Sequence, residues 1–176
     1  MQFEYQNQPG IGLRATTVRS QVWNRTSDVL FVGDVVMTDT LATQSESSKT
    51  QTNNGADDYP LNNVIVPTTA GIGVLTADPG YWFGVVENLG TAGTGADNTK
   101  VGVVWISERV DVLITTGTTS EYGKPVYPAD GADGVTTTQV DGVKALGRVL
   151  VDTTTSAAVS PCMWDGIHGI GTTYLT

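Results

Sequence analysis

The apolar residues of this 176-residue chain occur in short runs rich in valine, and glycine or another turn-forming residue bounds most of these runs. Nowhere do apolar side chains recur with helical spacing over a window of roughly eleven residues. The 21 glycines and the recurring threonines and valines also favour strands and turns over helices. We therefore expect an all-β protein.

Several segments have the length and the β-branched content of strands. They are residues 20–24, 28–37, 63–66, 81–88, 101–107, 109–115, 124–128 and 144–151. In the segment 109–115, alternation predicts one apolar face and one partly polar, wet face, which carries Asp111. Gly33, Gly84 and Gly102 lie inside predicted strands and indicate bulges or bends that curve the sheet. A curved sheet predicts a single β-barrel or β-sandwich domain.

The length of the chain fits one domain with a hydrophobic core and an additional arm. We expect an extended N-terminal arm at residues 1–20 and the all-β domain at residues 21–176. Polar residues dominate the segments 42–60 and 90–100, so both are expected to be long surface loops. The first of them is expected to be a flexible insertion.

The charge of the chain is unevenly distributed. Through residue 25 the chain carries Arg14, Arg19 and Arg25 against Glu4, which gives +2. The total is −9, so the remainder carries −9 − 2 = −11. This balance argues against nucleic-acid binding, which needs clustered cations. Arg14 and Arg19 are candidates for pairing with acidic groups of a neighbouring subunit or of another protein.

The arm has two alternative roles. Pro9 and the nearby glycines disfavour a regular helix, so the arm is expected to order on a partner. Alternatively, it adds a strand to its own domain and buries Ile11, Leu13 and Val18.

The sequence predicts neither a membrane span nor a secretory signal. No segment is apolar over the roughly 18 to 20 residues that a span needs, and the N-terminal residues lack a basic start and an apolar run. We expect a soluble protein. Asn24 matches the glycosylation sequon with Arg25 and Thr26, but without a secretion signal that match indicates little.

No combination of residues predicts a cofactor, a metal site or a catalytic centre. Asp130 and Asp133 lie in two Asp-Gly pairs between strand-like segments, which favours a hairpin turn over a calcium loop, because no bidentate glutamate follows. His168 is the only histidine and has no nucleophile motif beside it. Glu87 and Glu108 would form a glycosidase acid pair only if their strands brought them face to face.

Cysteine and tryptophan supply the remaining candidates. Cys162 is the only cysteine, so no internal disulfide forms, and we expect it to be a small buried hydrophobe. Trp82 and Trp105 lie in apolar strands and are expected in the core. Trp164, which follows the last predicted strand, is the candidate for contact with another molecule.

Two stretches of the chain carry a resemblance to a known family. The first stretch is GDVVMTD at residues 33–39. The second, residues 101–152, contains an apolar strand, a Gly-x-x-Val-Tyr turn, a Thr-rich strand and a Gly-x-x-Leu strand. Together they resemble the small β-barrel decoration, or cement, proteins of tailed bacteriophage capsids. In this chain the elements of the pattern lie at residues 33–36, 110–114, 123–127, 135–138 and 147–150. The arm and the insertion at 42–60 depart from the compact family pattern.

The resemblance implies a non-enzymatic virion protein that is made in the host cytoplasm and binds the exterior of the capsid. Its partners would be the major capsid protein, at joints between subunits, and further copies of itself in a symmetric homo-oligomer, for which a trimer is one arrangement. It implies no cofactor, no nucleic-acid partner and no membrane partner. The alternative is a carbohydrate-binding module of a phage tail fibre or spike, which would use exposed aromatic residues and loop carboxylates.

Overall fold

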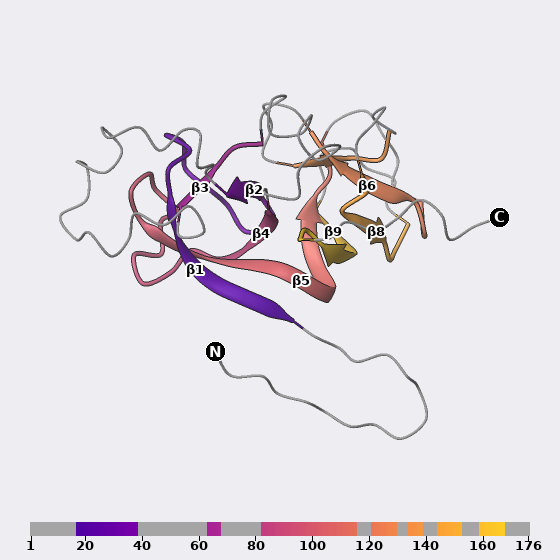
Figure 1. Cartoon of the computed structure of the whole chain (residues 1–176), viewed down its shortest axis with the longest axis horizontal. Coiled ribbons are helices and arrows are strands. Elements are labelled where there is room, and N and C mark those ends of the chain that lie inside the picture. The colour runs from indigo at the N-terminus through magenta and orange to yellow at the C-terminus, as the bar shows by residue number, and fades with distance from the viewer. Residues whose placement is uncertain are drawn as a thin grey trace, which may run out of the picture.

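The computed structural model describes residues 17–38, 63–67, 82–115, 121–129, 134–138, 144–152 and 159–167. Within these ranges the regular structure consists of strands, so the expected all-β class is confirmed (Figure 1). The strands are β1 (Val18–Asn24), β2 (Val35–Thr38), β3 (Asn63–Ile65), β4 (Phe83–Asn88), β5 (Lys100–Leu113), β6 (Pro125–Pro128), β7 (Val135–Thr136), β8 (Gly147–Val149) and β9 (Val159–Asp165). None of the described segments forms a helix long and apolar enough to cross a membrane.

The strands form one sheet in the order β1-β3-β2-β4-β5-β9-β8-β6-β7. β1 also pairs with β5 in antiparallel register, from Val18 opposite Ile106 to Trp23 opposite Lys100. The strands β1, β3, β2, β4 and the first part of β5 therefore close into a ring. Within this ring β1 and β3 are parallel, and the other pairs are antiparallel.

The second part of β5 pairs with β9, and β8, β6 and β7 follow in the sheet. The last of these strands, β7, lies next to the end of β5. Ile114, directly after β5, forms a bridge to Val135 of β7, and the Thr115 amide donates to the Val135 carbonyl at 2.7 Å. The expected barrel thus consists of two rings that share β5.

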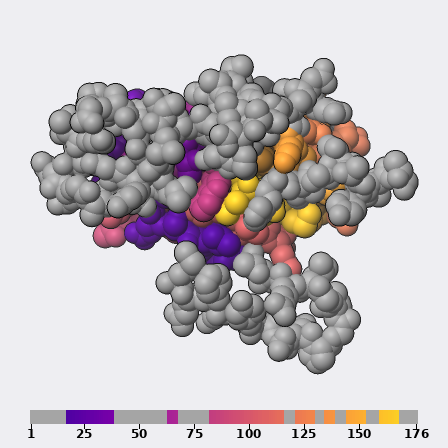
Figure 2. All heavy atoms as spheres, in the orientation of Figure 1, coloured from indigo at the N-terminus to yellow at the C-terminus, as the bar shows by residue number. Residues whose placement is uncertain are grey.

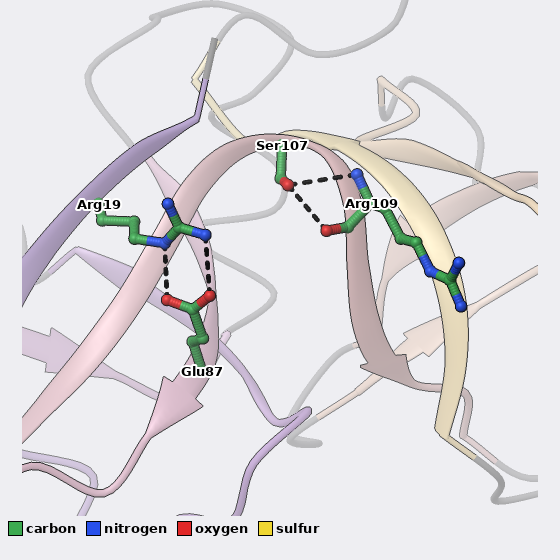
Figure 3. Close-up of polar contacts among 4 residues, drawn as sticks. All are labelled: Arg19, Glu87, Ser107 and Arg109. Atoms are coloured by element: carbon green, nitrogen blue, oxygen red, sulfur yellow. Dashed lines mark hydrogen bonds and ion pairs between the residues drawn. The ribbon is translucent and has the colours of Figure 1, made fainter. Parts of the chain in front are cut away.

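β5 joins the two strands predicted at 101–107 and 109–115 into one strand of 14 residues. Its register against β9 shifts between Ser107 and Val110, which is a β-bulge. The Ser107 hydroxyl accepts a hydrogen bond from the Arg109 amide (3.2 Å) and donates one to the Arg109 carbonyl (2.8 Å). The side chain thereby satisfies the backbone groups where the ladder is interrupted, and the strand bends there (Figure 3).

Two apolar clusters form the core, one on each face of the central strands. Val86 and Val103 belong to one cluster, and their neighbours Val85 and Val104 belong to the other. Successive residues of a strand point to opposite faces, so β4 and the first part of β5 are covered on both sides. The first cluster is built around Trp105, with Val22, Leu30, Val36, Val64, Val86, Val101 and Val103. The second includes Met37, Phe83, Val112, Ile114, Val126, Leu146, Cys162 and Trp164.

The strand predicted at 28–37 is wrong in its first part, because only β2 (Val35–Thr38) is a strand. Residues 28–34 form a loop that turns at Gly33, whose φ is +100°. The Phe31 amide donates to the Asp34 carboxylate at 2.6 Å, which closes this turn. The apolar run from Val29 to Val32 resembles a strand in sequence, but only Leu30 of the run is buried.

β9 was not predicted, because Pro161 in its middle is typical of edge strands and turns. In the structure β9 lies between β5 and β8. Its inward residues are Ser160, Cys162 and Trp164, while Val159 and Met163 face outward. The Pro161 carbonyl still accepts from the Leu150 amide at 2.9 Å.

The other predicted features are largely confirmed where the structure describes them. β6 and β7 pair antiparallel with Pro128 opposite Val135, so the segment between them is a hairpin connection, although Asp130 and Asp133 themselves lie outside the described residues. The loop at 90–100 consists of turns and lies mostly at the surface. β1 begins at Val18, so the last residues assigned to the arm belong to the domain. Residues 1–16, the insertion at 42–60 and His168 also lie outside the described residues.

Gly84 of β4 allows the Trp105 ring to pack closely against the sheet. A Cβ atom at residue 84 would lie 2.1 Å from Cγ1 of Val103 and 2.9 Å from two carbons of the Trp105 ring. Contacts this short cannot be accommodated without moving the core. The glycine in this strand therefore allows the side chains of Val103 and Trp105, from the neighbouring strand β5, to pack over β4.

We predict that Gly84→Ala lowers the free energy of unfolding by about 2–3 kcal/mol, because the added methyl overpacks the core around Trp105. Urea unfolding monitored by tryptophan fluorescence measures this loss. The double variant Gly84→Ala/Val103→Ala should be less destabilised than the two single losses added together, since it removes the shorter clash. Additive losses would show that Val103 does not limit the space at residue 84.

Candidate functional site

The bulge of β5 places charged side chains at the molecular surface. Glu108 and Arg109 are both exposed, which breaks the alternation of the strand. Val110 then points inward and Asp111 outward, so the expected wet face of residues 109–115 is confirmed. Arg109 and Asp111 therefore lie on one face of the strand, two residues apart.

A hollow of about 300 Å³ lies beside this bend. Val86 and Val110, which are both buried, are among the residues that line it. Its other lining residues are Val32, Glu87, Arg109 and Asp111. The volume is at the lower end of the range of pockets that bind small molecules, roughly 300–1,000 Å³.

The Arg19–Glu87 ion pair is close to the hollow. Nε of Arg19 lies 2.7 Å from Oε2 of Glu87, and Nη2 lies 3.0 Å from Oε1, so the contact is bidentate (Figure 3). These hydrogen bonds raise the pKa of Arg19. Arg19 comes from β1 and Glu87 from β4, and these strands flank β5, so the pair bridges over β5. Arg19, expected to bind another protein, thus already has a carboxylate partner in its own chain.

Arg109 and Asp111 have no such partner among the residues that the structure describes. The Arg109 side chain points away from the Arg19–Glu87 pair (Figure 3). Arg109 and Asp111 are both exposed and carry opposite charges on the same face of β5. Within the described part of the chain, a cation and an anion without ion-pair partners therefore lie on one face of β5 at the edge of the hollow.

Exposed apolar side chains continue from the hollow along the loop before β2. Val29 is 49% exposed, Phe31 64% and Val32 49%. Val159 of β9 is 47% exposed and adjoins this loop, because its methyl groups lie 3.3 and 3.4 Å from where a Cβ of Gly33 would be. We refer to Val29, Phe31, Val32 and Val159 as the apolar rim. The atoms of the N-terminal strands (indigo) and of β9 (yellow) are exposed on the same face of the molecule in Figure 2.

Asn24 holds the start of the loop that carries the rim. Its side chain is fully buried and donates to the carbonyls of Asp28 (2.8 Å) and Gly95 (2.9 Å). Its Oδ1 atom accepts from the Thr26 amide (2.8 Å) and the Thr26 hydroxyl (2.7 Å). The Leu30 amide adds a bond to the Gly95 carbonyl at 2.9 Å. The loop is therefore tied to the 90–100 loop before it reaches Phe31.

A second exposed apolar group lies on other elements. Tyr122, in the turn before β6, is 72% exposed, Val151 after β8 is 49% exposed and Met163 of β9 is 36% exposed. The Tyr122 amide donates to the Asp152 carboxylate, which connects the turn to the segment of Val151. We refer to Tyr122 and Val151 as the Tyr122 cluster.

The expectation that Trp164 contacts another molecule is wrong. Trp164 is only 1% exposed, and its indole N–H donates to the Phe83 carbonyl at 3.1 Å. It is buried because β9 is a central strand and Trp164 is one of its inward residues. Trp105, 2% exposed, lies in the core as expected, with its ring edge-on to half-buried Trp82 at 5.9 Å. The position of Trp164 after the last predicted strand therefore did not indicate that its side chain is exposed.

Glu87 and Glu108 do not form a facing acid pair. Glu87 lies between Val86, opposite Val103 of β5, and Asn88, opposite Gly102. Glu108 is several residues further along β5, in the bulge, and Glu87 is already bound to Arg19. Among the described residues, no three histidine, cysteine, aspartate or glutamate side chains cluster closely enough to hold a metal ion.

Two residues that border the hollow, Arg109 and Asp111, were not identified as site residues from the sequence, and neither was Phe31. The alternation of residues 109–115 did indicate a polar face, but not a neighbouring hollow. No protein-family model matches the chain, and no curated protein matches it. The functional inference therefore depends on the surface of this chain and on the sequence resemblance.

We predict that Asn24→Ala lowers the free energy of unfolding by about 2–4 kcal/mol, because it removes a fully buried side chain that donates to the carbonyls of Asp28 and Gly95 and accepts from the amide and hydroxyl of Thr26. Asn24→Asp should cost at least as much, since a carboxylate oxygen would then face those carbonyls. Asn88→Ala is the matched control, because Asn88 is exposed and its Oδ1 accepts from the Gly90 amide at 3.0 Å. Urea unfolding of the three variants tests this, and equal losses for Asn24→Ala and Asn88→Ala would contradict it.

Cys162 is fully buried, as expected, and burial followed by the nearby Asp111 charge raises the pKa of its thiol to about 12. We predict that a thiol reagent labels the native protein only as fast as the protein unfolds. The folded thiol stays neutral above its ordinary value of 9.0, whereas the unfolded thiol ionises. The contribution of Cys162 to stability is therefore complete below pH 9 and falls as the pH rises towards 12.

The comparison with Cys162→Ala isolates this pH effect from the titration of other groups. The stability advantage of the wild type over the variant should shrink between pH 9 and 12. An advantage that is constant over this range, or labelling of the native thiol at the rate of an exposed cysteine, would show that Cys162 is accessible.

Proposed function

We propose that this protein is a viral structural protein that decorates and stabilises the outside of a bacteriophage capsid, at joints between major capsid protein subunits. It would be made in the host cytoplasm, act without catalysis, and self-associate as a symmetric homo-oligomer. The resemblance of residues 33–39 and 101–152 to capsid decoration proteins supports this role. The observation that carries it is the presence of exposed apolar groups on two sets of elements, the apolar rim and the Tyr122 cluster.

Two apolar surfaces suit a protein that must contact both its own copies and a shell. Single exposed hydrophobic residues are common on soluble proteins, but large aromatic residues at the surface are typical of interface anchors. Phe31 and Tyr122 are the most exposed of the large hydrophobic side chains that the structure describes. The backbone amide of each residue donates to an aspartate side chain: the Phe31 amide to Asp34 and the Tyr122 amide to Asp152. These bonds hold the backbone that presents each side chain, and a preordered backbone loses less entropy on binding.

The sugar-binding alternative loses its named residue. A carbohydrate-binding module needs exposed aromatic rings on which sugars stack, and Trp164 lies in the core. Trp23 is half-buried, and Arg25 and Lys100 lie over its ring, with the Lys100 ammonium 4.9 Å from the ring centre. The exposed aromatic residues in the described part of the chain are therefore Phe31 and Tyr122. Mutation of Tyr122 distinguishes the two functions.

We predict that the wild-type protein raises the temperature at which shells of the same virus's major capsid protein open, because a ligand that binds the intact shell stabilises it by mass action. Tyr122→Ser should weaken binding to these shells by about tenfold or more, as expected for loss of an aromatic anchor. Cosedimentation measures the binding. Gln21→Ser, at an exposed position of β1, is the control and should bind like the wild type.

Two results would contradict the proposed function. One is an electron-microscopy map of native virions in which this protein occupies the tail tip and is absent from the capsid lattice. The other is saturable binding to a glycan array that Tyr122→Ser abolishes, combined with no binding to shells. The second result would establish the carbohydrate-binding alternative.

A further inference from the structure

The bend of β5 presents a surface that is complementary to itself. Arg109 and Asp111 carry opposite charges on one face of the strand and are spaced by about 7 Å, the rise of two strand residues. If a second copy faces this strand across a two-fold axis, the cation of each copy lies opposite the anion of the other. Two reciprocal ion pairs then form, whereas a copy in parallel orientation would place like charges together.

The hollow and the apolar rim fit the same two-fold arrangement. The hollow of about 300 Å³ is lined by three valines, Val32 of the rim, Val86 and Val110, beside its charged residues. Phe31, next to Val32, is 64% exposed. In a two-fold pair, an aromatic side chain beside the hollow of one copy is brought to the hollow of the other.

The charged residues at the hollow differ in whether they have an ion-pair partner within the described part of the chain. Arg19 and Glu87 neutralise each other through two hydrogen bonds, so they do not need another partner. Arg109 and Asp111 are the charged lining residues for which the described part of the chain provides no ion pair. A partner that supplies one anion and one cation at this spacing together with an apolar group is complementary to this surface, and this chain itself presents that combination.

We propose that a second copy of this chain binds at the bend of β5 across a two-fold axis. Phe31 of each copy enters the hollow of the other copy, and Arg109 of each copy pairs with Asp111 of the other. This assignment rests on the self-association in the proposed function, and it names the surface that self-association uses. The Tyr122 cluster, on other elements, remains available to the shell.

Charge reversal in the full-length protein tests the proposal. In Arg109→Asp both positions are anionic, and in Asp111→Arg both are cationic, so each variant alone should dimerise at least about tenfold more weakly than the wild type because like charges then face each other. A mixture of the two variants restores both opposite-charge pairs and should form a heterodimer. The double variant Arg109→Asp/Asp111→Arg should dimerise like the wild type. Sedimentation equilibrium measures the masses and the dissociation constants.

Further variants separate the contributions. Phe31→Ser should weaken dimerisation about tenfold or more, as an apolar anchor removed from its pocket. Lys124→Asp is the control, because it reverses a charge in the turn of Tyr122, where Lys124 pairs with Glu121 at 3.4 Å. It should leave the dimer unchanged. Raised salt should weaken the wild-type dimer, since exposed ion pairs are screened. Circular dichroism confirms that the variants fold, as expected for exposed positions.

Several outcomes would overturn the proposal. A wild-type protein that stays monomeric up to its solubility limit, a trimer whose mass does not change with either reversal, or a failure of the mixed variants to associate would each exclude the two-fold contact. No shell is present in these measurements, so they are independent of capsid binding. A monomer that still stabilises shells would overturn this inference alone, and a dimer that does not bind shells would overturn the proposed function alone.

Discussion

The fold depends on β5, because this single strand pairs with β1 and β4 along its first part and with β9 along its second. Both rings include it, so neither can close without it. The bulge at Ser107 allows one strand to serve both rings, since the bend turns the second part of β5 towards β9 and Ile114 towards β7. The side chains of β4 and β5 that alternate between the two faces then supply both apolar clusters. The same bulge exposes Arg109 and creates the edge of the hollow.

Much of the fold was predictable from the sequence because it follows from periodicity and turn chemistry. The β-branched runs indicated the strands, the flanks of the Asp-Gly pairs indicated a hairpin, and residues 109–115 showed their wet face. The errors arose where tertiary contacts decide the local structure. The run from Val29 to Val32 has strand-like composition, but the buried amide of Asn24 fixes it as a loop. β9 contains Pro161, whose missing amide hydrogen argues against a central strand, and packing of its neighbours Cys162 and Trp164 outweighs that loss.

The candidate site was less predictable than the fold, because the sequence gives the sign of a charge but not its neighbour. Arg19 was expected to pair with acidic groups of another subunit or protein, and the carboxylate that it binds here, Glu87, comes from the same chain, far along the sequence. Trp164 was judged by its distance from predicted strands, and the strand that buries it had been missed. Arg14 lies outside the described residues. Alternation places Arg109 and Asp111 on one face, but the hollow beside them is formed with residues of β4 and of the loop before β2, which the sequence of β5 does not reveal.

The pairing of β1 with β5 also has a consequence for the order of events during synthesis. Val18 pairs with Ile106, which is 106 − 18 = 88 residues later in the chain. At the usual elongation rates, roughly 4 to 18 s pass between the synthesis of these two residues. β1 therefore leaves the ribosome long before its partner strand and must remain soluble without it. The middle of β1 is polar, because its exposed residues are Arg19, Ser20 and Gln21. The side chains that face solvent in the folded domain therefore also protect β1 from pairing with other chains before β5 has been synthesised.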